Sequence, residues 1–259
     1  MPRPRGSPRK CRTSAPDANE TDSQMKRLTN VAAVVPVFDP EPALPKLCEE
    51  LLRVFGTVVV VDDGSVNFLE RFAMLPQGVV VLKHSRNMGK GRAIKTALGW
   101  LDGKAAGAVF VDGDGQHDPG DAAGVAASML ENGCVTLGSR DLSGNGVPAA
   151  SRIGNACMSF FLRLFAGAKV SDTQTGLRAI PARLFVDLAK VRGEKFEYEM
   201  NMLAALHLAG EPVCEMPVRT IYPDEGRVSH HRPFRDSVRI WFSLAWFSLC
   251  RRLRARGAA

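Results

Sequence analysis

Residues 106–119, AGAVFVDGDGQHDP, join an apolar run to a polar turn, and residues 112–117 of this turn carry two carboxylates, an amide and an imidazole. The apolar run shows no polar alternation, which is typical of a strand buried on both faces of a parallel sheet. Glycines beside the aspartates Asp112 and Asp114 allow the backbone to turn tightly. Because ligands of open α/β sheets bind at the carboxyl ends of strands, this turn is a candidate ligand site.

Other segments of the chain repeat the same apolar texture. They are VAAVVPV (31–37), TVVVVDDGS (57–65) and GVVVLKH (78–84), and helical stretches lie between them at residues 42–55, 66–75 and 89–101. Strands that alternate with helices predict a doubly wound, Rossmann-like α/β sheet. Farther along the chain we expect helices at 119–131, 151–167 and 196–210, and strands at 134–140, within 170–185 and at 212–222.

The net charge of +7 is concentrated at the two ends of the chain. Residues 1–30 are polar and basic without apolar periodicity, and residues 226–259 contain eight arginines and one aspartate. We therefore expect a disordered tail at 1–30, one globular domain at 31–225 and a basic amphipathic helix at 226–259. A mildly acidic body argues against a nucleic-acid-binding face. The six cysteines lack metal-site spacing, which favours reduced thiols and a cytoplasmic location.

The C-terminal segment has an apolar centre, Ile240 to Cys250, between groups of arginines. This run is too short to cross a bilayer, which takes about 20 residues in a helix. Trp241 and Trp246 suit the interface, so we expect the segment to lie on an anionic membrane surface. The alternative is a helix packed on the globular domain.

Three local features are candidates for anion or metal chemistry, and each has a structural alternative. The Asp112–Asp114 turn can aim two carboxylates at a hard cation, or it can simply cap the next helix. The turn at 87–92, which contains Lys90, resembles a phosphate-binding helix start, or it is an ordinary helix start. Arg140 and Arg152 suit phosphate groups, although single arginines more often lie on the surface or cap a helix.

The order of these motifs is more specific than any one of them. PVFDP, VVVDDGS, N-x-G-K-G, FVDGDGQHDP, GSR and SDTQTGLRAIP follow one another between residues 31 and 222. In that order they resemble the family 2 glycosyltransferases of GT-A fold. Within that family they look most like the dolichyl-phosphate mannose synthases and the bacterial polyprenyl-phosphate glycosyltransferases. The resemblance implies a nucleotide-sugar donor, UDP- or GDP-linked, and a polyprenyl phosphate acceptor.

The resemblance also implies a nucleotide pocket. Its acidic pair, here Asp62 and Asp63, would hold the base and the ribose. Pro36, Phe38 and Asp39 would line the same pocket.

The resemblance further implies a metal and phosphate site. Asp112 and Asp114 would bind Mg²⁺ or Mn²⁺ together with the donor diphosphate, helped by Gln116. Arg140 and Arg152 would contact phosphate groups of the donor and the acceptor.

The expected reaction is an inverting sugar transfer at the cytoplasmic face of a membrane. An ionised phosphate acceptor needs no strong general base, whereas a saccharide hydroxyl would need one. Glu197 and Glu199 are the candidates for that base, or they are acidic residues that stabilise a helix N-terminus. A non-catalytic nucleotide-sugar-binding domain is a third possibility, which the presence of Asp112, Asp114 and Arg140 disfavours. The absence of G-x-G-x-x-G after the first strand argues against a dinucleotide-binding oxidoreductase.

Overall fold

The computed structural model describes residues 28–143 and 147–219, and the statements below concern those residues. The strands are β1 (Leu28–Val37), β2 (Phe55–Asp62), β3 (Val79–Lys83), β4 (Gly107–Phe110), β5 (Val135–Arg140), β6 (Arg178–Pro181) and β7 (Val213–Val218). The helices are α1 (Leu44–Val54), α2 (Phe68–Phe72), α3 (Lys90–Leu101), α4 (Pro119–Asn132), α5 (Ala149–Ala166), α6 (Phe185–Ala189) and α7 (Glu197–Ala209), with a 3-10 turn η1 (Ala182–Leu184).

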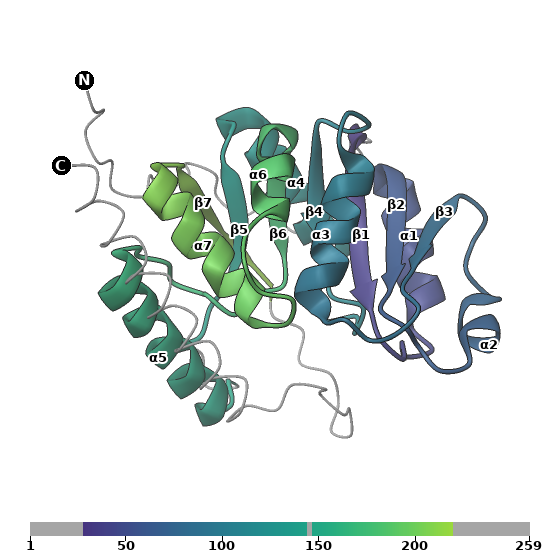
Figure 1. Cartoon of the computed structure of the whole chain (residues 1–259), viewed down its shortest axis with the longest axis horizontal. Helices are drawn as coiled ribbons and strands as arrows, with labels where there is room; N and C mark the ends of the chain where they lie inside the picture. The colour runs from purple at the N-terminus through teal and green to yellow at the C-terminus, as the bar shows by residue number, and fades with distance from the viewer. Residues whose placement is uncertain (1–27, 144–146, 220–259) are drawn as a thin grey trace.

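The strands form one seven-stranded sheet in the order β3-β2-β1-β4-β6-β5-β7 (Figure 1). β1 pairs in parallel with β2 and β4, and β2 pairs in parallel with β3. β6 is inserted between β4 and β5 and runs antiparallel to both. The predicted α/β sheet is confirmed, and the antiparallel β6 is a feature that the sequence pattern did not reveal.

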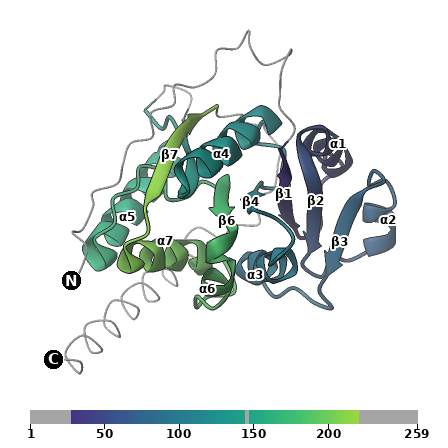
Figure 2. The ribbon, with the colours of Figure 1, turned by 90° about the horizontal axis from the view of Figure 1, so that it is seen from above.

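Helices cover both faces of the sheet, with α1 and α4 on one side and α3, α6 and α7 on the other (Figure 2). The valines of β2 show why both faces are covered. Val59 and Val61 pack on the α3 side, whereas Val58 and Val60 pack on the α1 side, since successive side chains of a strand point in opposite directions. All four are fully buried. An apolar run without alternation therefore gives a central strand.

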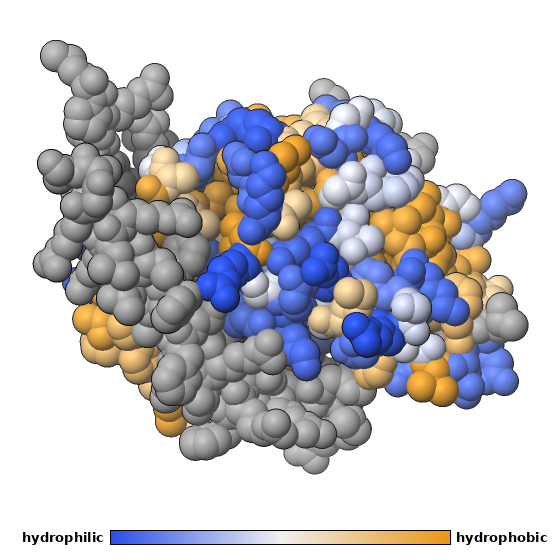
Figure 3. Space-filling view, in the orientation of Figure 1, coloured by the Kyte–Doolittle hydropathy of each residue, from blue (hydrophilic) through white to orange (hydrophobic). Residues whose placement is uncertain are grey.

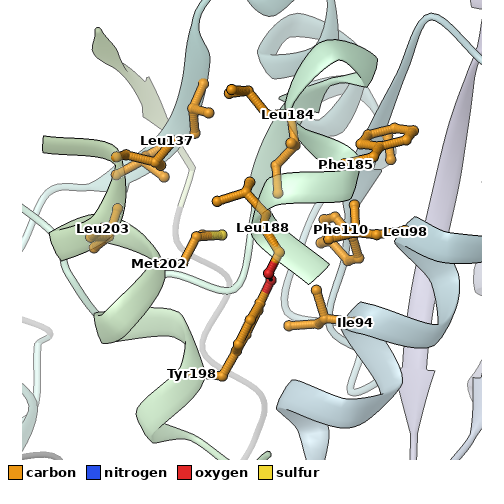
Figure 4. Close-up of a cluster of buried hydrophobic side chains, with 14 of the residues drawn as sticks. Ile94, Leu98, Phe110, Leu137, Leu184, Phe185, Leu188, Tyr198, Met202 and Leu203 are labelled. Carbon is orange, nitrogen blue, oxygen red and sulfur yellow. Dashed lines mark hydrogen bonds between the residues drawn. The ribbon is translucent and has the colours of Figure 1, made fainter. Parts of the chain in front are cut away.

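The apolar core between α3, α6 and α7 fixes the positions of these helices relative to one another (Figure 4). Leu98 of α3 lies near Phe110 of β4, and Tyr198 of α7 reaches between the helices. The buried hydroxyl of Tyr198 donates to the carbonyl oxygen of Leu188 at 3.0 Å. Since the start of α3 and the start of α7 share this core, their polar residues are held near each other.

Element boundaries differ from the expectation at a few places. β1 begins at Leu28, three residues earlier than expected, so the last residues of the predicted 1–30 tail belong to a strand. α2 has five residues, Phe68–Phe72, where a ten-residue helix was expected. The remainder of the tail and the whole helix predicted at 226–259 lie outside the described residues. Within residues 28–143 and 147–219, no helix combines the length and the hydropathy needed to cross a bilayer.

Candidate active site

The carboxyl ends of β2, β1 and β4 lie side by side, because β1 pairs in parallel with both neighbours. β2 ends at Asp62, β1 ends at Val37, and Asp112 follows the end of β4 by two residues. The strand order changes direction at this point, since β2 lies on one side of β1 and β4 on the other. Ligands of open α/β sheets bind at such a point.

Asp112 begins a chain of charges that alternate in sign. Its Oδ1 lies 2.8 Å from Nζ of Lys90, and that nitrogen is also 3.3 Å from Oε2 of Glu199. Oε1 of Glu199 lies 3.5 Å from Nη2 of Arg178. The second oxygen of Asp112 faces Nε2 of His117 at 3.6 Å. We call Asp112, Lys90, Glu199 and Arg178 the charge network; it joins the loop after β4 to α3, α7 and β6.

The charge network shifts the pKa values of its members. Burial favours the neutral form of Asp112, but attraction to Lys90 and contact with His117 outweigh it and hold the pKa of Asp112 well below its ordinary 3.8. Burial also opposes the charge of Lys90, yet Asp112 and Glu199 raise the pKa of Lys90 above its ordinary value. Asp114 behaves in the opposite way, because burial and the nearby charge of Asp112 raise its pKa.

Asp114 and Gln116 complete the polar turn after β4. The backbone N–H of Gln116 donates to Oδ1 of Asp114 at 3.0 Å, and both side chains are half-buried. Among the described residues, no three His, Cys, Asp or Glu side chains converge to enclose a metal ion. Mg²⁺ and Mn²⁺, however, are commonly held by one or two carboxylates and take further oxygens from water and substrate phosphates. The oxygen donors of this turn fit such an open site.

The two glutamates at the start of α7 have different surroundings. Glu199 belongs to the charge network through Lys90. Oε1 of Glu197 accepts the backbone N–H groups of Glu194 and Lys195 at 3.2 and 3.4 Å. Glu197 therefore stabilises the loop before α7, and Glu199 is the glutamate that these contacts place at the site.

The turn at 87–92 uses its backbone amides within the protein. The N–H groups of Met88 and Gly89 donate to the carboxylate of Asp63 at 2.9 and 2.6 Å. Those two amides therefore support the loop within the protein, and phosphate binding by the rest of the turn stays a prediction. Lys90 nevertheless reaches the site, through its side chain.

Asp62 and Asp63 are both buried but have different partners. Besides the two amides, the carboxylate of Asp63 contacts Nδ1 of His84 at 2.7 Å. Oδ1 of Asp63 takes two of these contacts and Oδ2 takes one, so Asp63 supports the loop before α3; its role as a nucleotide ligand stays a prediction. Oδ1 of Asp62 accepts the N–H of Ser65 at 2.9 Å, whereas its buried Oδ2 has no hydrogen-bond partner within the described part of the chain. An unpaired buried oxygen is costly, which makes Asp62 a candidate acceptor for a ligand.

Pro36, Phe38 and Asp39 lie at the end of β1, next to the end of β2. Asp39 has a φ of 47°, which few residues other than glycine adopt. Its N–H donates to Oγ of Ser65 at 2.8 Å, and its carboxylate accepts the N–H of Val66 at 3.0 Å. These bonds tie together the loops after β1 and β2. The structure thus brings all three residues to the edge that carries Asp62.

The two arginines differ in their surroundings. Arg140, the last residue of β5, binds the fully buried Asp172 through Nε at 2.7 Å and Nη2 at 3.0 Å. This two-point contact fixes the guanidinium, which has further N–H groups beyond the two that Asp172 receives. Arg152 is exposed in the first turn of α5, and no ion pair of Arg152 is found among the described residues.

Sequence reasoning assigned no role to Asp172, Gly176 or Arg178. Besides contacting Glu199, Arg178 donates to the carbonyl oxygen of Thr175 at 2.8 Å while almost fully buried. The available signal was the composition of SDTQTG (171–176), a polar run between apolar segments that is largely buried in the structure. Buried polar runs need specific partners, and these partners lie far away in sequence.

Comparison with known proteins agrees with this architecture. The sequence model of Glycosyl transferase family 2 matches residues 32–186. An uncharacterised protein of Methanocaldococcus jannaschii is 30% identical over 201 residues, which are 75% of this chain and 82% of that protein. The UDP-N-acetylglucosamine–dolichyl-phosphate N-acetylglucosaminyltransferase of Methanococcus voltae is 27% identical over 214 residues, which cover 74% of this chain and 85% of that protein.

A solved structure shares the fold. Glucosyl-3-phosphoglycerate synthase from Mycobacterium tuberculosis, in complex with Mn²⁺, uridine diphosphate and phosphoglyceric acid, superposes with a TM-score of 0.61. The match covers 86% of this chain and 78% of that one at 15% identity. The region matched by the family model spans more than half of the chain and includes Asp62, Asp112 and Arg140. The resemblance expected from the motifs is confirmed, and the chain belongs to the family 2 glycosyltransferases of GT-A fold.

Proposed function

We propose that this glycosyltransferase moves a sugar from a UDP- or GDP-linked donor to a polyprenyl phosphate, with inversion at the anomeric carbon. The observation that supports a nucleotide-sugar donor best is the turn after β4. There Asp112 and Asp114 present carboxylates at the edge where Asp62 keeps an unpaired buried oxygen. The carboxylates of Asp112 and Asp114 suit a metal ion with a diphosphate, and the oxygen of Asp62 suits the hydroxyl or N–H groups of a nucleoside.

Each part of the donor has a proposed contact. Asp112, Asp114 and Gln116 would hold Mg²⁺ or Mn²⁺, which when bound neutralises charge on the leaving diphosphate. The Lys90 ammonium, 2.8 Å from Asp112, lies where it can add positive charge next to the same phosphates. Asp62 would accept hydrogen bonds from the nucleoside, with Pro36, Phe38 and Asp39 beside it.

The proposed transfer needs no proton to be moved. An oxygen of the acceptor phosphate forms a bond to the anomeric carbon, and the bond from that carbon to the donor diphosphate breaks. The electron pair of the broken bond stays on the nucleoside diphosphate, and the product is a lipid-linked sugar phosphodiester. Since the acceptor phosphate is already ionised near pH 7, the protein has to orient it and compensate its charge, for which Arg140 and Arg152 are the candidates.

A lipid acceptor is supported by the exposed face of α5. Ile153, Cys157, Phe160 and Leu164 follow one another at helical spacing and are exposed, with Ile153 at 66% and Phe160 at 60%. We call these four residues the α5 stripe; it contributes to the apolar patch at the lower left of Figure 3, where Figure 1 places α5. Arg152 lies on the same helix, so a lipid held against the stripe would bring its phosphate near that arginine.

A soluble hydroxyl acceptor is the second candidate. Glu199 favours it, because a buried carboxylate in the charge network could take the proton that a hydroxyl must lose. The structural relative from Mycobacterium tuberculosis was solved with phosphoglyceric acid, a small soluble molecule.

Product partitioning separates the two candidates. Protein is incubated with radiolabelled UDP- and GDP-sugars, Mn²⁺ or Mg²⁺, and polyprenyl phosphate, and the mixture is then extracted with organic solvent. Label in the organic phase supports the lipid acceptor. Asp114→Ala should abolish most of this label, whereas Asp187→Ala, which changes an exposed aspartate of α6, should not. Transfer that persists in excess chelator would contradict the proposed metal.

Membrane contact is tested separately. We propose that the α5 stripe and the basic C-terminal segment bind the cytoplasmic face of an anionic membrane. Co-sedimentation with liposomes of increasing anionic lipid content would compare the full chain, a chain ending near Pro233 and Phe160→Ser/Leu164→Ser. Loss of binding in either variant supports the proposal. Equal binding of all three proteins, or no binding at all, would favour the soluble acceptor.

A further inference from the structure

The loop before β6 leaves no room for a side chain next to Asp112. At Gly176, a Cβ atom would overlap the carboxyl group of Asp112, with Oδ1 only 2.6 Å away. The three atoms nearest to that position all belong to this carboxyl group. The backbone of Gly176 lies outside the left-handed region, so its conformation does not require glycine. Glycine is required at this position because a larger residue would occupy the space of the Asp112 carboxyl group.

The loop cannot move away from Asp112 easily. The side-chain oxygen of Asn155 accepts the backbone N–H of Thr173 at 2.9 Å and the hydroxyl of Thr173 at 3.0 Å. Arg178 holds the carbonyl oxygens of Thr173 and Thr175 at 3.1 and 2.8 Å. All four residues are buried. A methyl group at position 176 would therefore displace the side chain of Asp112 in preference to the loop.

We infer that Gly176 is a positioning residue for Asp112, and that its missing side chain sets the direction in which the carboxylate faces the metal and diphosphate. In this inference Gly176 acts through Asp112, whose carboxyl group lies against it. The inference rests on the proposed function, since the metal is the group that Asp112 would hold. Replacing residues that orient a metal ligand typically weakens metal binding by about 10–100-fold.

Calorimetric titration with Mn²⁺ in the presence of UDP or GDP tests the inference without turnover. Gly176→Ala should bind Mn²⁺ about 10–100-fold more weakly than the unchanged protein. Gly99→Ala is the matched control, because a Cβ at that position of α3 would meet no atom within 4 Å among the described residues outside its own stretch of helix. Equal Mn²⁺ affinity in Gly176→Ala and Gly99→Ala would overturn the inference. If the unchanged protein binds no Mn²⁺ with either nucleotide, the proposed metal site is what fails.

A double variant keeps the inference testable if Gly176→Ala does not fold. Asp112→Ala removes the atoms that the new methyl group would meet. Gly176→Ala/Asp112→Ala should therefore unfold at the same temperature as Asp112→Ala alone, although Gly176→Ala lowers the midpoint in the unchanged background. An equal loss of midpoint in both backgrounds would show that the methyl group collides with something other than Asp112, and would refute the inference.

Discussion

Replacing Lys90 with methionine should destabilise the protein strongly, because it removes the cation that pairs with both Asp112 and Glu199, and of these two only Glu199 keeps an arginine partner, Arg178, among the described residues. The methionine keeps an unbranched apolar side chain of similar reach and removes the ammonium that lies 2.8 and 3.3 Å from the two carboxylates. The Lys90 side chain is 20% exposed and that of Asp112 is 30% exposed, so the pair is largely removed from water. Removing one partner of a buried pair costs about 3–5 kcal/mol, and partial hydration places this one near 3 kcal/mol.

The loss of stability in Lys90→Met should become smaller as the pH falls. In the unchanged protein the folded-state pKa of Asp112 is depressed, so its contribution to stability is present above its ordinary value of 3.8 and is lost as the pH falls below it. Without Lys90, the strongest attraction that lowers the pKa of Asp112 is gone, so this pKa should lie higher in the variant than in the unchanged protein, and acid should neutralise Asp112 in the folded variant at a higher pH. The stability difference between the two proteins should be largest near pH 7 and should narrow as the pH approaches 4.

Thermal and urea unfolding measure this difference, with Lys46→Met as the control. Lys46 is exposed and lies 4.0 Å from Glu50 in a surface pair, for which a loss of about 0–1 kcal/mol is expected. At about 2–4 °C per kcal/mol for a protein of this size, Lys90→Met should lower the midpoint by roughly 6–12 °C. Equal losses for the two lysines, or a Lys90 effect that does not change with pH, would refute the reasoning.

Three further changes test other parts of the site. Asp62→Asn should weaken UDP or GDP binding by about 1–3 kcal/mol in calorimetry and leave the metal requirement unchanged, and equal nucleotide affinity would contradict its assignment. Because the pKa of Asp114 is raised above 3.8, activity should fall in acid at a pH above that value. In rate–pH profiles, more Mn²⁺ should move this fall to lower pH, because the metal competes with the proton for Asp114. Gly91→Ala should lower the free energy of unfolding in urea by about 1–3 kcal/mol, because the new Cβ would lie 2.5 Å from Cβ of Tyr198 and 2.8 Å from the backbone oxygen of Lys195. A Gly91→Ala variant as stable as Gly99→Ala would count against this packing.

The parts of the structure that were predicted from sequence have local signals. The strand that ends at Asp62 is a continuous valine run, and β4, which precedes Asp112, has the same texture. Apolar runs of this kind mark buried parallel strands, and polar residues directly after them mark the carboxyl edge. The edge that carries the candidate site was therefore predictable before any contact was known.

The parts that were missed depend on contacts between residues far apart in the chain. β6 has four residues, and its antiparallel direction follows from pairing with β4 and β5, which no local pattern records. The role of Asp63 depends on amides 25 and 26 residues away, and that of Asp172 on an arginine 32 residues away. Gly176 has neither positive φ nor a turn pattern, so its role follows from the position of Asp112 alone.

Alternation of charge explains how four ionisable groups can lie together, partly buried, at one edge of the sheet. Each member of the charge network has an oppositely charged neighbour, which offsets the loss of water around it. Apolar residues in the same places would often be at least as stable, so stability alone does not account for the network. What the network supplies is orientation, because Lys90 cannot shift without weakening its ion pairs with both Asp112 and Glu199. Fixed dipoles and charges at the place where a diphosphate leaves lower the barrier without reorganising during the reaction. In the proposed function, a network held from α3, α7 and β6 would supply such fixed charges.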